Sequence, residues 1–151
     1  MLKILCVGKL KEKYLIDAEE EYIKRIKKYS NIDIIEIEDC KIDDSKVALS
    51  MEEKNIKKYI TSKDFLITLE IEGNQLSSVD FSKKLDYFIS NNKNIIFLIG
   101  GSHGISDAIK NRSDYKLSFS KMTFPHQLFR IILLEQIYRC YKIINNERYH
   151  K

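Results

Sequence analysis

The chain has 151 residues, a formal net charge of +4, and only five glycines and one proline. This length suits one domain covering residues 1–151, and 44% hydrophobic with 32% charged residues is an ordinary globular balance. Disordered, collagen-like and linker-rich chains are excluded, because each needs far more Gly, Pro or Ser. Three cysteines without a C-x-x-C pair argue against a disulfide framework or a structural zinc site, so we expect no metal and a cytoplasmic protein.

Positive charge is concentrated at the carboxyl-terminal end. Between Lys116 and Lys151 there are seven basic and two acidic residues, whereas the rest of the chain carries a net charge of −1. Such an end permits contact with nucleic acid or another polyanion, but a solvated helix face would explain the same surplus. No apolar stretch reaches the roughly 20 residues of a membrane span, so we expect no membrane partner.

Short apolar or β-branched runs alternate with segments whose apolar residues recur every three or four positions. We expect Asp44 or Ser45, Ser78 and Thr123 to cap helices. The alternation predicts an α/β fold with a mainly parallel sheet and helices on both faces. In chain order the predicted elements are strand 2–7, helix 15–29, strand 32–37, helix 44–60, strand 65–71, helix 78–89, strand 94–99, helix 106–111, strand 115–119 and helix 125–144.

The last predicted helix is apolar almost all round, so it must be buried on more than one side. One side would meet the sheet. The other would meet a second subunit related by two-fold symmetry, or the helix would be central within one chain. We favour the homodimer, and expect Glu135 and Arg139 to pair along the helix.

A glycine turn follows the strand predicted at residues 94–99. Its pattern, G-G-x-x-G at Gly100, Gly101 and Gly104, is neither a dinucleotide fingerprint nor a P-loop. Ligands of parallel α/β sheets bind beyond the carboxyl ends of the strands, where glycines let a flat ligand approach the backbone. A plain tight turn explains the same glycines.

Two other segments could carry chemistry. The junction at residues 117–127 holds the only proline, Pro125, and His126, which we interpret as structural. The tail ends in Tyr149, His150 and Lys151, which together can stack on a base, move a proton and hold a phosphate. A disordered tail is the ordinary alternative.

These motifs resemble the RlmH family of ribosomal RNA methyltransferases, within the SPOUT superfamily. The similarity covers essentially the whole chain and is specific from about Phe97 onward. Arg148 stands where that family commonly has proline, and Phe129 and Cys140 are larger than the expected small residues. The matching segments are Val7–Lys9, Glu21–Arg25, Thr68–Glu70, Gly73, Ile99–Gly101, Leu117–Gln127, Arg130, Leu134–Arg139 and Tyr149–Lys151.

The resemblance implies methyl transfer from S-adenosylmethionine to N3 of a pseudouridine in 23S rRNA, on the assembled 70S ribosome. It also implies a homodimer and a C-terminal trefoil knot, which periodicity alone would never predict. The candidate catalytic residues are His150, Tyr149 and Arg130. His150 and Tyr149, from the partner's tail, would remove the N3 proton, and Arg130 with Lys151 could contact phosphate or cofactor. The implied cofactor-binding residues are Leu69, Gly101, Ser120, Lys121, Met122, Thr123, Phe124 and Pro125.

Two alternatives stay open from the sequence. The chain could be a non-catalytic RNA- or ribosome-binding dimer of the same fold, which would bind RNA in a salt-dependent way but not S-adenosylmethionine. It could also be a different α/β enzyme that uses the glycine turn for another nucleotide.

Overall fold

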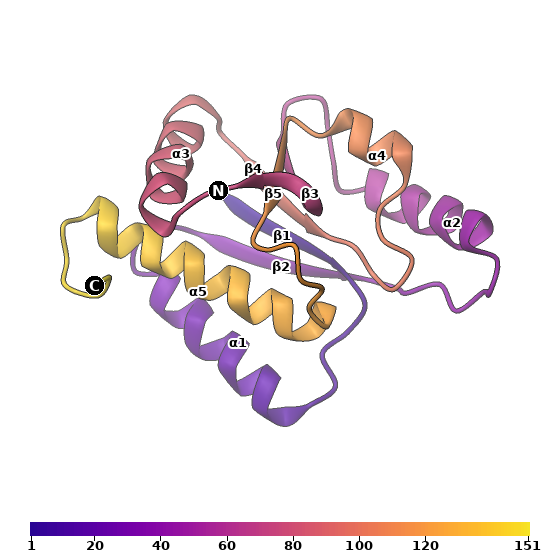
Figure 1. Cartoon of the computed structure of the whole chain (residues 1–151), viewed down its shortest axis with the longest axis horizontal. Coiled ribbons are helices and arrows are strands. Elements are labelled where there is room, and N and C mark those ends of the chain that lie inside the picture. Colours follow the sequence, from indigo (N-terminus) through magenta and orange to yellow (C-terminus); the bar gives the residue numbers. More distant parts are fainter.

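A five-stranded, all-parallel sheet forms the centre of the computed structural model, which describes residues 1–151 (Figure 1). The strand order is β2 (Ile32–Ile37), β1 (Leu2–Val7), β4 (Ile95–Ile99), β3 (Phe65–Gln75) and β5 (Tyr115–Ser118). Helices α1 (Lys13–Ile26), α3 (Ser78–Asn91) and α5 (His126–Ile144) cover one face. Helices α2 (Ser45–Lys57) and α4 (Asp107–Arg112) cover the other, so the predicted α/β fold with helices on both faces is confirmed.

Alternation along the strands divides the apolar side chains between two cores. On β1, Leu2, Ile4 and Cys6 face the larger core beneath α1, α3 and α5, whereas Leu5 and Val7 face the smaller core beneath α2 and α4. Every residue of β4 is buried, as is usual for a central parallel strand. Each fully buried aliphatic side chain contributes about 1.5–3 kcal/mol relative to an exposed one, so these two layers hold the fold together.

Helix α5 lies between α1 and α3, which accounts for much of its apolar circumference within one chain. Leu133, Leu134 and Ile137 are completely buried against the sheet, whereas Leu128 is 41% exposed. The central-helix interpretation therefore holds for a single chain, and the homodimer stays a prediction. The expected pair on this helix is confirmed, with Arg139 Nη2 2.6 Å from Glu135 Oε1. No helix in the structure is both long and apolar enough to span a bilayer.

Strand β3 runs further than the sequence predicted. It continues through Gly73 to Gln75, and its register against β5 breaks so that Leu117 is opposite both Leu69 and Asn74. A Cβ on Gly73 would lie 2.8 Å from the backbone carbonyl carbons of Lys116 and Leu117. The glycine thus allows two backbones to touch within the sheet, and it does not mark the end of a strand.

Two of the predicted helix caps were wrong. Ser77, not Ser78, caps α3 by accepting a hydrogen bond from Asp80 N, and the Ser78 hydroxyl instead donates to Gln136 Oε1 of α5. Helix α5 begins after Pro125 with no side-chain cap, so Thr123 is not its cap. The proline already fixes the entry of the chain into this helix. Asp44 caps α2 as predicted.

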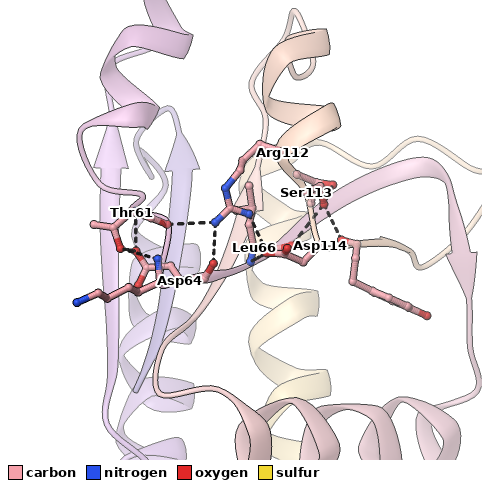
Figure 2. Close-up of polar contacts among 9 residues, drawn as sticks. Thr61, Asp64, Leu66, Arg112, Ser113 and Asp114 are labelled. Carbon is pink, nitrogen blue, oxygen red and sulfur yellow. Dashed lines mark hydrogen bonds and ion pairs between the residues drawn. The ribbon is translucent and has the colours of Figure 1, made fainter.

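A polar cluster ties together the edge of the sheet where β3 and β5 begin (Figure 2). Arg112 Nη2 donates to the carbonyl oxygens of Thr61 and Asp64, and Arg112 Nη1 donates to Asp114. The Asp114 carboxylate also accepts from Leu66 N. These bonds join the loop before β3 to the loop before β5, and they fix the amino ends of two strands that line the candidate site.

Candidate active site

A pocket of about 580 Å³ lies at the carboxyl ends of β4 and β5 and beside the middle of β3. Three stretches make most of its wall: residues 69–72 of β3, 99–105 at the end of β4, and 117–126 after β5. Ligand sites of parallel α/β sheets lie at this edge, and the volume falls in the range of about 300–1,000 Å³ typical of small-molecule sites. Because β4 and β5 are followed by loops there, ligand-contacting backbone is exposed without disrupting the sheet.

Seven of the eight residues expected to hold the cofactor line this pocket. Lys121 is the exception, although both its neighbours line the wall. The loop that carries them is held by its own serines, since Met122 N donates to Ser120 Oγ and Ser118 Oγ donates to Ser120 O. The seven expected residues that line the pocket are Leu69, Gly101, Ser120, Met122, Thr123, Phe124 and Pro125.

The glycines after β4 form a tight turn that also lines the pocket. Gly104 N donates to Gly101 O at 3.0 Å, and Gly104 has a left-handed φ of +80°. A Cβ on Gly100 would lie 2.7 Å from Gly104 O, and one on Gly101 would lie 2.9 Å from Val7 Cγ1. Neighbouring protein atoms therefore require both glycines, so the tight-turn interpretation is correct and the turn also supplies pocket wall.

Sequence reasoning gave no ligand role to four charged or titratable residues of the pocket: Glu70, Glu72, Lys110 and His126. Glu70 accepts a hydrogen bond from Thr68 Oγ1 and lies 3.9 Å from Lys110 Nζ. Glu72, on the same strand, lines the same wall. The position of Glu70 directly after Leu69, at the end of a predicted strand, is the signal that could have identified it.

Arg130 lies outside the pocket. Its side chain is only 2% exposed, and its guanidinium donates to Glu19 of α1, Glu36 of β2 and the Gly8 carbonyl. Burial raises the pKa of the neighbouring Cys6 thiol to about 12, although the Arg130 charge opposes this shift. Cys6 is therefore a core side chain rather than a nucleophile, and Arg130 joins three elements near the pocket.

The tail folds back onto its own α5. Tyr149 Oη donates to Glu135 Oε1 at 3.1 Å, and His150 Nδ1 lies 3.2 Å from Arg139 Nη1. Burial and the Glu135 carboxylate raise the pKa of Tyr149 to about 12.

Glu135 lies nine residues along α5 from His126, or about 14 Å at 1.5 Å per residue. The carboxyl terminus is beyond the end of α5, away from its first turn (Figure 1). Within one chain, therefore, neither Tyr149 nor His150 lines the pocket.

The whole chain is similar to known methyltransferases. A family described as predicted SPOUT methyltransferase matches residues 1–150. The putative ribosomal RNA large subunit methyltransferase H of Methanococcus maripaludis is 52% identical over 99% of both chains. The ribosomal RNA large subunit methyltransferase H of Clostridium tetani is also 52% identical over 99% of both, and that of Caldicellulosiruptor saccharolyticus is 45% identical over all of both.

Among solved structures, a probable methylase family protein from Haemophilus influenzae superposes with a TM-score of 0.59. The match covers 99% of this chain and 70% of that one, at 9% identity. At this identity the likeness supports the fold alone.

Proposed function

Because this chain belongs to the SPOUT methyltransferase family, we propose that it transfers a methyl group from S-adenosylmethionine to N3 of a pseudouridine in 23S rRNA. The proposed substrate is the assembled 70S ribosome in the cytoplasm, and the proposed active form is a homodimer with a C-terminal trefoil knot. One observation carries the proposal: a single pocket formed by β3 and the carboxyl ends of β4 and β5 gathers seven of the eight residues expected to hold the cofactor.

The pocket suits the methyl donor chemically. S-adenosylmethionine supplies a methyl group already activated by a sulfonium, so the transfer needs no metal ion. Glu70 and Glu72 on the β3 wall provide negative charge that favours a cationic ligand, and Leu69, Phe119 and Phe129 provide apolar surface. The loops at residues 99–105 and 117–126 also bring backbone groups that can hydrogen-bond a nucleoside.

The acceptor nitrogen must lose its N3 proton as its bond to the methyl carbon forms, so a positioned base is required. We propose that Tyr149 and His150 of the partner's tail supply this function. The geometry of one chain supports this, because its own tail rests on Glu135 and Arg139, away from its own pocket. Lys151, exposed at the terminus, is proposed to contact RNA phosphate.

The dimer is supported by the outer face of α5, opposite the side chains of this helix that are buried against the sheet. Leu128 is 41% exposed there, and Ile131 and Ile132 are only partly buried. An exposed apolar strip of this kind fits a second subunit related by two-fold symmetry. The same arrangement would bring a partner's tail to the pocket of its neighbour.

Calorimetry with S-adenosylmethionine, ATP and NAD tests the ligand. We expect only the first to bind, and at a hundredfold excess over its dissociation constant it should stabilise the fold by about 2.7 kcal/mol. Binding of ATP or NAD instead would favour a different α/β enzyme. No binding of any nucleotide, combined with salt-sensitive RNA binding, would favour a non-catalytic RNA-binding dimer.

A methylation assay tests the reaction. Intact ribosomes should be methylated faster than isolated 23S rRNA, and mass mapping should locate the methyl on a pseudouridine. Deleting Tyr149–Lys151 should abolish transfer while cofactor binding persists. Methylation by the deletion variant at the wild-type rate would contradict the role of the tail, and His150→Gln compared with Tyr149→Phe separates the two side chains.

A further inference from the structure

The loop that joins β1 to α1, residues 8–12, lies beside the pocket. A Cβ on Gly8 would lie 3.2 Å from Nε2 of His126, which lines the pocket. Lys11 N donates to Oε1 of Gln127, the next residue of α5, at 3.2 Å. Although the loop and the start of α5 are more than a hundred residues apart in the sequence, they form one continuous surface.

The backbone of this loop is fixed from both ends. Arg130 Nη2 donates to Gly8 O at 3.1 Å, and Gly8 N donates to Ile37 O at 2.8 Å. Glu36 Oε2 accepts from Arg130 and from Leu10 N, at 3.1 and 3.0 Å. The buried guanidinium of Arg130 therefore connects α5, β2 and the loop, and it holds the loop in one place relative to the pocket.

This fixed loop presents two unpaired basic side chains, Lys9 and Lys11, and one exposed carboxylate, Glu12. Lys9 and Lys11 are exposed, and neither ammonium group has an ion pair or a hydrogen bond. Lys13, by contrast, is paired with Asp17 at 2.6 Å. Tyr14, 69% exposed, adds a flat aromatic surface beside them. Glu70 and Glu72 line the β3 wall of the pocket, with Lys110 Nζ 3.9 Å from Glu70, whereas Lys9 and Lys11 lie on the side toward α5 and β1.

We propose that the β1–α1 loop binds backbone phosphates of the RNA through Lys9 and Lys11, and that Arg130 is a positioning residue for this loop. The proposal rests on the proposed RNA substrate and adds where the RNA lies outside the pocket. Lysines neutralise phosphates as point charges, and their fixed backbone limits the entropy lost when they bind. Arg130, too buried to reach phosphate, would act through the loop.

The test compares Lys9→Gln/Lys11→Gln with the control Lys54→Gln/Lys58→Gln. The control lysines are also exposed, but they lie at the end of α2, on the other face of the sheet. Binding of 23S rRNA is measured between 50 and 200 mM salt. Loss of two phosphate contacts should flatten the salt slope by roughly 1.4, so the wild type should lose about 7-fold more affinity than the variant over this range.

The control should keep the wild-type slope, and both variants should bind S-adenosylmethionine like the wild type. Unchanged RNA affinity and slope in the Lys9/Lys11 variant would overturn the proposal, as would an equal change in the control. Normal RNA binding with weakened ribosome binding would also overturn it, because the loop would then contact ribosomal protein.

Arg130→Lys tests the positioning role. It keeps a positive charge but loses the forked contacts to Gly8 and Glu36, so RNA affinity and KM should worsen while the salt slope and kcat stay unchanged. A changed slope would mean that Arg130 itself meets phosphate. The binding assay requires no methyl transfer, so lysine-dependent RNA binding without methylation would refute the proposed function alone. If the protein methylates RNA but Lys9 and Lys11 are not needed for RNA binding, the role of the loop is refuted and the proposed function stands.

Discussion

Replacing Arg130 with methionine should destabilise the protein through the carboxylates it leaves behind. The guanidinium is 2% exposed and is bonded to Glu19, Glu36 and the Gly8 carbonyl. Removing one partner of a buried ion pair costs about 3–5 kcal/mol. Glu36 is 36% exposed and can regain water, whereas Glu19 is only 17% exposed, so we expect about 3 kcal/mol, from the lower end of that range.

The loss of stability should depend on pH, and Glu19 determines whether it is larger at high or at low pH. Burial raises the pKa of Glu19, and its hydrogen bond to Arg130 opposes that rise. Without Arg130 the folded-state pKa rises further above the unfolded value, so the ionised carboxylate opposes folding at neutral pH. That penalty disappears as pH falls through the folded-state pKa, and Arg130→Met should therefore lose less stability at pH 5 than at pH 7.

Urea unfolding at pH 7 and pH 5 measures both effects. At pH 7 the midpoint of thermal unfolding should also fall, by roughly 6–12 °C at about 2–4 °C per kcal/mol for a domain of this size. The double variant Arg130→Met/Glu19→Gln should be less destabilised than the sum of the single changes, since it leaves no charge without a partner. A loss below about 1 kcal/mol at pH 7, or an equal loss at both pH values, would refute this account of Arg130.

Three further predictions follow from single residues. Gly104 has a left-handed φ of +80° and open space around its Cβ position, so Gly104→Asn should be tolerated. Gly104→Val should lower the free energy of unfolding by about 1–2 kcal/mol more than Gly104→Asn, and equal urea midpoints for the two variants would contradict this. The difference spectrum of wild type against Tyr149→Phe should titrate near pH 12, because burial and Glu135 keep this phenol neutral, and titration near 10 would mean that the tail is undocked. Burial raises the thiol pKa of Cys6 and of Cys140 to about 12, so iodoacetamide should label Cys40 first in the native protein, and peptide mapping would reveal any earlier labelling of the buried pair.

Much of the fold could be predicted because its signals are local. The five strands and five helices appear where apolar periodicity placed them, because a buried parallel strand and an amphipathic helix each produce a recognisable pattern of apolar residues along the sequence. The errors arose where a distant partner decided the outcome. The predicted strand ends at residue 71, but β3 continues through Gly73, where the β5 backbone passes within contact distance.

The candidate site shows the same division. The resemblance implied that the glycine turn and the Ser120–Pro125 loop share a site, and their positions after predicted parallel strands agree with the pocket that they line. Glu70 was missed although it directly follows Leu69, because a solvated strand end shows the same local pattern as a pocket wall. The dimer and the source of the catalytic base stay predictions that depend on a second chain.

Sequence by itself determined the element order and the parallel α/β class, because both depend on residues adjacent in the chain, and its resemblance to a known family indicated the segments that line the pocket. Tertiary structure alone decided that Arg130 is an internal anchor, since its partners Glu19, Glu36 and Gly8 are 94 to 122 residues away. It also decided that the loop carrying Lys9 and Lys11 contacts the first turn of α5. The charge of an arginine is visible in a sequence, but whether that charge meets solvent or a buried carboxylate depends on which elements pack around it.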